Sequence, residues 1–354
     1  MSARVRRLDP RPFTTLALAA AGALVFHLAG LPLPFLLGPM AACLAGAFAG
    51  ARMRDLGLLG TFMRTFLGVA AGSAITPDMV GHLPDFALSL AFVPLFVLLI
   101  GAAGYPLFRR VFGFDHATAW FGAMPGGLQD MLVFGEEAGG DVRALSLIHA
   151  SRVLVIVTVA PLVMSAVWGI DLSVPPGARA GDTDPLQIAL MVGACIAGWR
   201  IAAQLRLFGA TILGPMILTA ILSLSGIITT RPPAEIIWAA QFFIGMAVGA
   251  RYSGITVREL RVDVGAGVAY ALILSGISIL FIEVIRALDL APGLDAFLAF
   301  LPGGQSEMVV MAIIAGADLA YVVAHHLVRM VLVIALAPVA GRWSQRRPQR
   351  DDDL

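Results

Sequence analysis

Long apolar runs dominate the chain, separated by short polar segments or segments rich in glycine and proline. Many of these runs reach about 18 residues or more, the length at which a helix crosses a hydrocarbon core of roughly 30 Å. The pattern predicts an all-α polytopic membrane protein. In the first half, the predicted spans cover residues 13–30, 34–50, 57–75, 84–108 and 142–166.

Composition supports this class of protein. Of the 354 residues, 59% are hydrophobic and only 13% are charged, whereas a soluble domain is about one quarter charged. The excess apolar surface therefore needs the lipid bilayer as its partner. The formal net charge of +1 provides no basic surface, so we expect no nucleic-acid partner.

Metal and thiol chemistry find little support in the sequence. Cys43 and Cys195 lie inside apolar runs, which argues against a disulfide or a thiolate metal site. His325 and His326 are adjacent on a predicted helix, so their side chains point roughly 100° apart and chelate poorly. We predict no metal, no cofactor and no enzyme activity. The first apolar run could be a cleaved signal peptide, but we expect a retained span because its counterpart later in the chain is internal.

The chain contains an internal duplication. Sliding the sequence so that Gly68 meets Gly245 aligns motifs along its whole length. The pairs include Pro125-Gly126-Gly127 with Pro302-Gly303-Gly304, Asp141 with Asp318, His149 with His326 and Arg152 with Arg329; LGPM at 37–40 recurs at 213–216, one residue off this register. The alignment predicts a first membrane repeat over 1–168, a linker over 169–184, a second repeat over 185–341 and a cytoplasmic tail over 342–354.

The arginines indicate how the repeats enter the membrane. If each Pro-Gly-Gly segment crosses fully, a repeat has six crossings and the repeats are parallel; if it is a re-entrant hairpin, there are five and the repeats are inverted. With five crossings, the loop arginines concentrate on the cytoplasmic side, and only Arg179, Arg231 and Arg286 lie outside. Six crossings would place the 200–206 and 251–261 loops outside, against the positive-inside rule. We therefore predict inverted repeats with both termini cytoplasmic.

The two Pro-Gly-Gly segments are candidate binding sites. The arm over 114–123 has about ten residues, roughly 15 Å of helix, which reaches only the middle of a bilayer. Broken backbone at that depth occurs where it lines a cavity or is buried in protein. The alternative is a kinked helix whose glycines serve packing. Inverted repeats would bring both tips together near the midplane, as in many secondary transporters, so we predict substrate binding by Pro125, Gly126, Gly127, Pro302, Gly303 and Gly304.

Charged residues near these segments complete the candidate site. Arg152 and Arg329 lie inside predicted spans, each three residues after a histidine and so on the same helix face. They either form structural ion pairs or hold an oxyanion substrate together with His149 and His326. Asp130 and Glu307 follow the glycines as helix caps or as ligands of a coupling proton or Na⁺. The candidate ion-coupling residues are Asp130, Glu307, Asp141 and Asp318.

These motifs resemble the Gram-negative AbrB membrane duplication family, which shares only its name with the soluble DNA-binding regulator. The resemblance covers essentially the whole chain through LLGPM and ILGPM, MPGGLQDM and LPGGQSEM, and AxxD…HxxR in each half. It implies a duplicated membrane fold in the bacterial inner membrane. The family's labels, ammonia monooxygenase and regulator of gene expression, imply either oxygen chemistry at a metal, for which the sequence has no ligand cluster, or an indirect effect of moving a metabolite.

Three functions follow from these observations. We expect a secondary transporter of a small anionic solute, a carboxylate or an amino acid, working by alternating access. The first alternative is a membrane-embedded regulator or sensor that binds a ligand without moving it. The second is a metal-dependent membrane monooxygenase. A homodimer is left open.

Overall fold

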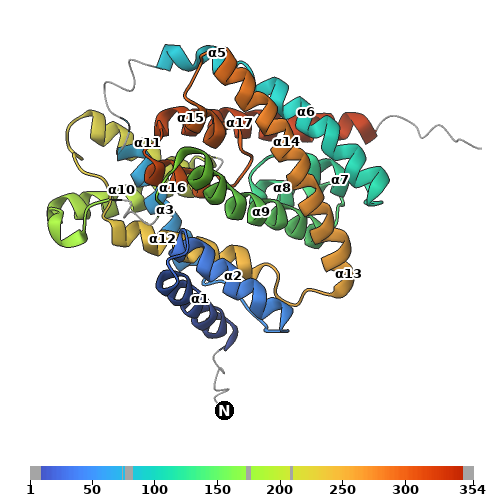
Figure 1. Ribbon diagram of the computed structural model, residues 1–354, viewed down its shortest axis with the longest axis horizontal. Coiled ribbons are helices and arrows are strands. Elements are labelled where there is room, and N and C mark those ends of the chain that lie inside the picture. The colour runs from blue at the N-terminus through green and yellow to red at the C-terminus, as the bar shows by residue number, and fades with distance from the viewer. Residues whose placement is uncertain (1–8, 74, 76–82, 173–176, 208–209, 346–354) are drawn as a thin grey trace, which may run out of the picture.

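The computed structural model describes residues 9–73, 75, 83–172, 177–207 and 210–345, and every regular element in these residues is a helix. The principal helices are α1 (Arg11–Leu28), α2 (Pro34–Phe48), α3 (Leu58–Ser73), α5 (Ala87–Leu90), α6 (Val93–Pro106), α7 (His116–Ala123), α8 (Leu128–Glu137), α9 (Val142–Trp168), α10 (Pro185–Gln204), α11 (Ala210–Leu224), α12 (Ala234–Ala250), α13 (Val257–Glu259), α14 (Gly265–Ala287), α15 (Gly293–Phe300), α16 (Gln305–Ala315) and α17 (Leu319–Gln345) (Figure 1). Residues 1–8 and 346–354, which hold the predicted cytoplasmic ends, lie outside the described residues, as do 173–176 of the linker.

Length and composition confirm the predicted class of a polytopic helical membrane protein. Six continuous helical stretches in the described residues are long and apolar enough to cross a bilayer: Arg11–Leu28, Pro84–Val111, Val142–Trp168, Pro185–Gln204, Val257–Ala287 and Leu319–Leu336. Shorter apolar helices are Pro34–Phe48, Ala210–Leu224 and Ala234–Ala250. The spans predicted for the first half coincide with α1, α2, α3, the α5–α6 stretch and α9.

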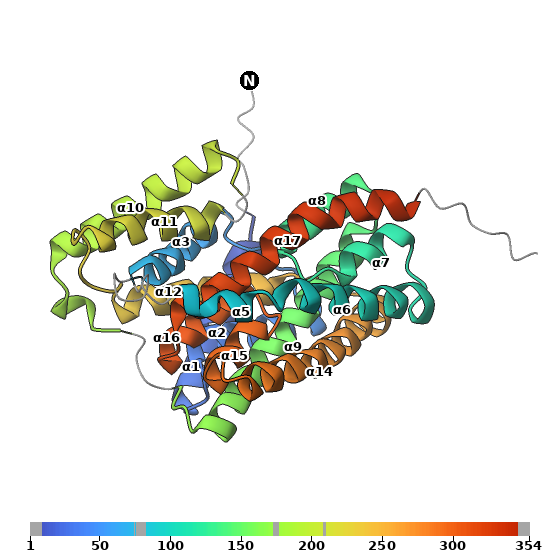
Figure 2. The same cartoon turned by 90° about the horizontal axis from the view of Figure 1, so that it is seen from above.

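Helices from the two halves of the chain interleave. α1–α3 pack with α10–α12, and we call these six helices the support group. The other set, the hairpin group, consists of α5–α9 and α13–α17. Figure 1 shows most of the support group at the left and lower left and most of the hairpin group at the upper right, and in Figure 2 α3, α10 and α11 lie to the left of α6, α7 and α14. Each spatial group therefore takes helices from both sequence repeats.

Close helix contacts exchange partners across the duplication. Gly68 of α3 lies against the backbone of Ile212 in α11, and Gly245 of α12 lies against the backbone of Leu36 in α2. Leu36 and Ile212 occupy equivalent positions, because each directly precedes an LGPM motif. A pseudo-two-fold arrangement produces such an exchange, and the contacts are those expected of a duplicated chain. Insertion of the two halves from opposite faces of the membrane stays a prediction.

Both Pro-Gly-Gly segments fold as helical hairpins. The backbone N–H of Asp141, which follows α8, donates to Thr118 Oγ1 at the start of α7 over 2.8 Å. In the second half, the N–H of Asp318 donates to Asp295 Oδ1 over 3.0 Å, which joins the end of α16 to the start of α15. The chain thus returns to the level at which it entered. Such hairpins fit the predicted scheme of five crossings and one re-entrant segment in each repeat, which stays a prediction.

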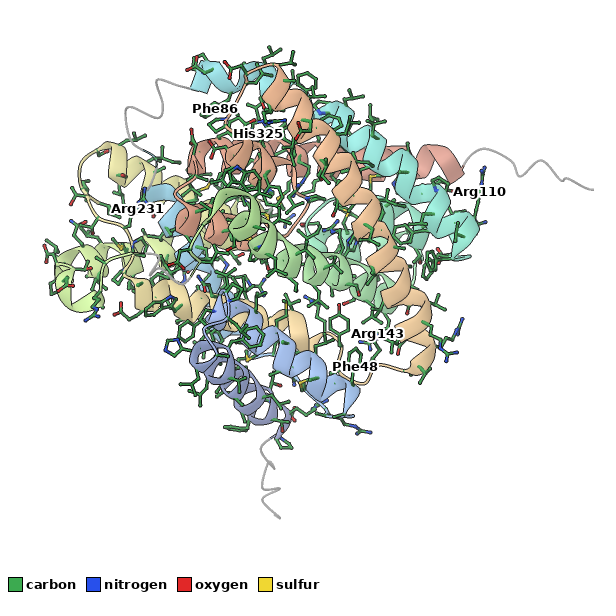
Figure 3. All side chains as sticks on the ribbon, viewed as in Figure 1. Phe48, Phe86, Arg110, Arg143, Arg231 and His325 are labelled. Carbon is green, nitrogen blue, oxygen red and sulfur yellow. The ribbon has the colours of Figure 1, made fainter. Side chains whose placement is uncertain are left out.

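A polar network that is not repeated at the equivalent positions of the duplication joins α5 to α17, where His325 lies (labelled in Figure 3). Ser89 Oγ lies 2.8 Å from His325 Nε2 and also hydrogen-bonds to the Tyr321 hydroxyl. His325 Nδ1 lies 2.8 Å from the Tyr321 carbonyl oxygen, which can only accept. Nδ1 therefore carries the proton, and Nε2 accepts from Ser89. Ser89 and His325 are buried, so the network fixes α5 on α17.

The substitution Ser89→Ala is expected to lower the free energy of unfolding by about 1–3 kcal/mol, because it leaves buried His325 Nε2 without a donor. The matched control is Ser275→Ala on α14, since the Ser275 hydroxyl bonds only to Ala271 of its own helix. Thermal unfolding of both variants in one detergent at one scan rate measures the effect. Equal midpoints for the two variants would show that the network adds nothing to stability.

Candidate functional site

A cavity of about 170 Å³ lies between the support group and the hairpin group. Both hairpin tips reach it, and α3, α9, α11, α12 and α17 supply the rest of its wall. Its lining residues that matter for binding are Arg64, Gly126, Gly127, Asp130, Arg152, Arg251, Gly303, Gly304, Gln305, Glu307 and Arg329. The structure therefore brings together most of the site residues predicted from the sequence.

The glycines let the hairpin tips turn against neighbouring side chains. A Cβ on Gly126 would meet Met131 and Val333, and one on Gly303 would meet Met308 and Ile156. The second helices, α8 and α16, begin at the tips with Gly127 and Gly304 as N-cap residues, and a glycine has no side chain that could cap a helix. Free N–H groups and the helix dipole at such ends attract anions. Pro125 and Pro302 are buried and form the turn without lining the cavity.

Arg152 of α9 and Arg329 of α17 are the central charges of the cavity. Their residues are 3% and 4% exposed. Among the described residues, Nε and Nη1 of both guanidiniums have no hydrogen-bond partner, and neither has Gln305 Nε2. An unpaired buried donor is costly, and a buried cation more so. This arrangement fits a wall built to surround an anion.

The histidines position groups of the protein and lie outside the cavity lining. His149 Nε2 donates to the carbonyl oxygen of Phe121 over 3.1 Å, and His326 Nε2 donates to that of Leu298 over 2.9 Å. His326 Nδ1 accepts from Arg329 Nη2 over 2.9 Å. The structure thus gives no contact of His149 or His326 with the cavity that their predicted substrate-binding role would use: each ties a long helix to its hairpin, and His326 also orients the arginine.

The four predicted ion-coupling carboxylates separate into two pairs. Half-buried Asp130 and the 5% exposed Glu307 line the cavity, and the Glu307 carboxylate folds back over Gly304. Asp141 Oδ1 instead accepts from the backbone N–H groups of Arg143 and Ala144 over 2.9 and 3.0 Å. Asp318 Oδ1 accepts from the N–H of Tyr321 over 3.0 Å. Asp141 and Asp318 therefore cap helices at the hairpin bases and do not line the cavity.

Two arginines of the cavity were not in the predicted site. Arg64 lies in the first half of α3, close enough to the helix end that its side chain could have reached the membrane surface. Arg251 follows α12, in a loop predicted to be cytoplasmic. Both arginines line the cavity. Arg143 of α9 holds that loop: its Nε donates to Glu259 over 2.8 Å, and its Nη1 donates to the Arg251 carbonyl over 3.1 Å (Figure 3). The sequence signal that could have indicated Arg64 is its place within an apolar run.

Comparisons with known proteins agree with the motifs. The family model described as "Transition state regulatory protein AbrB" matches residues 35–345. The chain is 27% identical to "Uncharacterized protein YhjN" of Bacillus subtilis (strain 168), over 91% of this chain and 90% of that protein. It is 26% identical to "Putative regulator AbrB" of Escherichia coli (strain K12), over 94% and 95%. No solved structure matches the chain. A family model that spans most of the chain, together with relatives of matching length, places this membrane protein in the AbrB family.

Proposed function

We propose that the protein is a secondary transporter of a small anionic solute, a carboxylate or an amino acid. The observation that carries the proposal is the pair of buried guanidiniums, with unpartnered Nε and Nη1 atoms, beside two re-entrant hairpin tips. Secondary transporters commonly place substrate between repeats, at broken helices whose N-termini attract anionic groups. Asp130 and Glu307, in the same cavity, are the candidates for binding a coupling proton or Na⁺. We place the protein in the bacterial inner membrane.

Exposure differs between equivalent positions on the two sides of the cavity, which supports alternating access. Ala247 and Val248 of α12 line the cavity and are half-buried. Their repeat mates on α3, Ala70 and Ala71, are only 2% and 1% exposed and belong to the hydrophobic core. An inverted repeat can exchange these two environments, which would open the opposite side. The present arrangement therefore fits one of two alternating states.

The interleaved packing indicates which parts move. The hairpin group carries Arg152, Arg329 and both tips, whereas the support group contributes one wall of the cavity. In the described residues, α16 meets the support group at α3 and α12, and α17 meets it at α3, in contacts much smaller than those inside the support group. We propose that the hairpin group moves against the support group as a body, since secondary transporters largely rock one rigid unit against another.

Flux through reconstituted protein tests the proposal. Proteoliposomes would be given labelled lactate, succinate, citrate or glutamate, with an imposed proton or Na⁺ gradient. We expect saturable uptake of at least one acid, and background uptake with the double variant Arg152→Gln plus Arg329→Gln. Binding of an acid by purified protein without flux of any acid in the panel would contradict transport.

A regulatory function is the second candidate, because the matching family description and the name of the Escherichia coli relative both denote regulators. In this reading the same cavity binds an anion and the resulting conformational change is passed to a partner. Binding without flux, together with ligand-dependent recovery of a defined cytoplasmic partner, would favour this candidate over transport.

Paired cysteines are expected to report the asymmetry of the two sides. In a background with Cys43→Ala and Cys195→Ala, Val248→Cys should react with a water-soluble maleimide at least about tenfold faster than its repeat mate Ala71→Cys, which is buried. Labelling of both variants in the same membranes, with total reactivity measured after denaturation, gives the ratio. Faster labelling of Ala71→Cys than of Val248→Cys would contradict the proposal that the cavity is open on the α12 side and closed on the α3 side.

A further inference from the structure

We propose that the cavity takes an anion with two acidic groups, a short dicarboxylate, held with one carboxylate on Arg152 and the other on Arg329. This inference rests on the anion-binding function proposed above and narrows its substrate class. It follows from the number of unpaired donors, from the charge of the lining and from the size of the cavity.

The unpaired donors exceed what a single carboxylate can accept. Nε of a guanidinium carries one hydrogen and Nη1 carries two, and a carboxylate has about four lone-pair sites. Arg152 and Arg329 both present unpartnered Nε and Nη1 atoms, and Gln305 Nε2 adds further hydrogens. A monocarboxylate bound to one fork would leave the other fork unpaired at 3% or 4% exposure. A ligand with two carboxylates offers acceptors to the unpartnered N–H groups of both guanidiniums.

The internal duplication gives the cavity two equivalent guanidiniums, which suits a ligand with an acidic group at each end. Arg152 and Arg329 are repeat mates on equivalent helices, and both line the cavity that the two hairpin tips reach. Arg329 Nη2 lies 3.4 Å from the carbonyl oxygen of Gly303, which fixes the fork near the second tip. A ligand bridging the equivalent forks therefore needs an acidic group at each end.

The charge of the lining matches a dianion. Four arginines, Arg64, Arg152, Arg251 and Arg329, face the cavity with two carboxylates, Asp130 and Glu307. With all these groups ionised, the wall carries an excess of two positive charges. Partly buried cations are stabilised when they are neutralised within the same low-dielectric site. A dianion neutralises the excess, and a monoanion or zwitterion does not.

The cavity limits the length of the ligand. Pockets for drug-sized ligands have volumes of about 300–1,000 Å³. The 170 Å³ cavity is smaller and fits a compact acid of about ten non-hydrogen atoms or fewer. Dicarboxylates with about four or five carbons meet this limit.

Calorimetric titration of the full-length protein in detergent with matched acids tests the inference. Butyrate and succinate have the same carbon count and differ in the second carboxylate; glutarate and glutamate differ in the ammonium. We expect succinate to bind at least about tenfold more tightly than butyrate, and glutarate at least about tenfold more tightly than glutamate. Arg152→Gln and Arg329→Gln, taken singly, should each weaken succinate binding by about 10- to 100-fold, with a smaller effect on butyrate.

Each other outcome has a definite meaning. Butyrate binding within about threefold of succinate overturns the dianion assignment and leaves the proposed anion transporter standing. Glutamate binding more tightly than glutarate replaces the dianion with a zwitterion and has the same consequence. If protein with intact helical content and monodispersity binds none of the four acids, the dianion assignment is overturned. The transporter proposal is overturned only if, in addition, no acid of the transport panel shows flux.

Discussion

The double variant Arg152→Gln plus Arg329→Gln is expected to lose anion binding by about 100-fold or more, because it removes both charged forks. The same variant should unfold at a higher temperature than the wild type without ligand, since it no longer buries two cations with unpartnered N–H groups. Thermal unfolding with and without succinate measures both effects. If the two arginines form a binding site, the double variant therefore gains stability and loses anion binding.

A surface arginine provides the control for these measurements. Arg286 pairs with Glu283, and the two side chains are 65% and 55% exposed. Arg286→Gln should leave both the unfolding temperature and the ligand-induced shift unchanged, because an exposed pair contributes little. A double variant that is less stable than the wild type, or that keeps its succinate-induced shift, would show that Arg152 and Arg329 are structural.

The substitution Gly245→Ala is expected to disrupt the support group. Its Cβ would lie less than 3.0 Å from the carbonyl oxygen of Leu36, a distance that real Cβ atoms essentially never show. Because the obstacle is backbone of another helix, α12 and α2 must separate. Overpacking costs about 1–3 kcal/mol, or more where a backbone has to shift. We expect a lower unfolding temperature and a poor yield of monodisperse protein.

The matched control is a helical glycine at which an added Cβ would have no close neighbour. A Cβ on Gly60 of α3 has no neighbour within 4 Å, so Gly60→Ala should be neutral or stabilising by up to about 1 kcal/mol through the helix preference of alanine. Gly68→Ala, at the repeat mate of Gly245, should behave like Gly245→Ala. Equal midpoints for Gly60→Ala and Gly245→Ala would contradict the close packing of α12 on α2.

Sequence periodicity and internal repetition predicted much of the fold. Apolar runs located the long helices, and the pairing of Pro125-Gly126-Gly127 with Pro302-Gly303-Gly304 located both hairpins. The interleaving of the support and hairpin groups was not predicted, because it depends on contacts between helices far apart in the chain. The sequence shows that Gly68 and Gly245 align between the repeats, but it does not show that each packs against the backbone of another helix.

The part of the site that could be predicted from the sequence consists of charged residues, which are costly to place in lipid. An arginine within an apolar run needs a partner, so Arg152 and Arg329 stood out. The hydrogen bonds of the histidines and the capping by Asp141 and Asp318 were not predicted, since proximity in sequence does not tell a cap or a positioning bond from a cavity wall. Arg251 was missed because charge counting assigned it to a loop.

The polar network around Ser89 marks a limit of reasoning from repeats. The repeat mates of Ser89, Tyr321 and His325 are Ala266, Ala144 and Ile148, which cannot form it. Alignment of the halves therefore gives no sign of this interaction. Only the packing of α5 on α17 brings its hydroxyls and imidazole together.

A cryo-electron microscopy map of the full-length protein in lipid nanodiscs, with the tightest-binding acid of the panel, tests the anion cavity most directly. We predict ligand density in contact with the guanidiniums of Arg152 and Arg329, beside glycines 126–127 and 303–304, with both hairpins returning to the side they entered. Segment 114–138 crossing the bilayer completely, or guanidiniums paired with protein carboxylates and no ligand density between them, would contradict it.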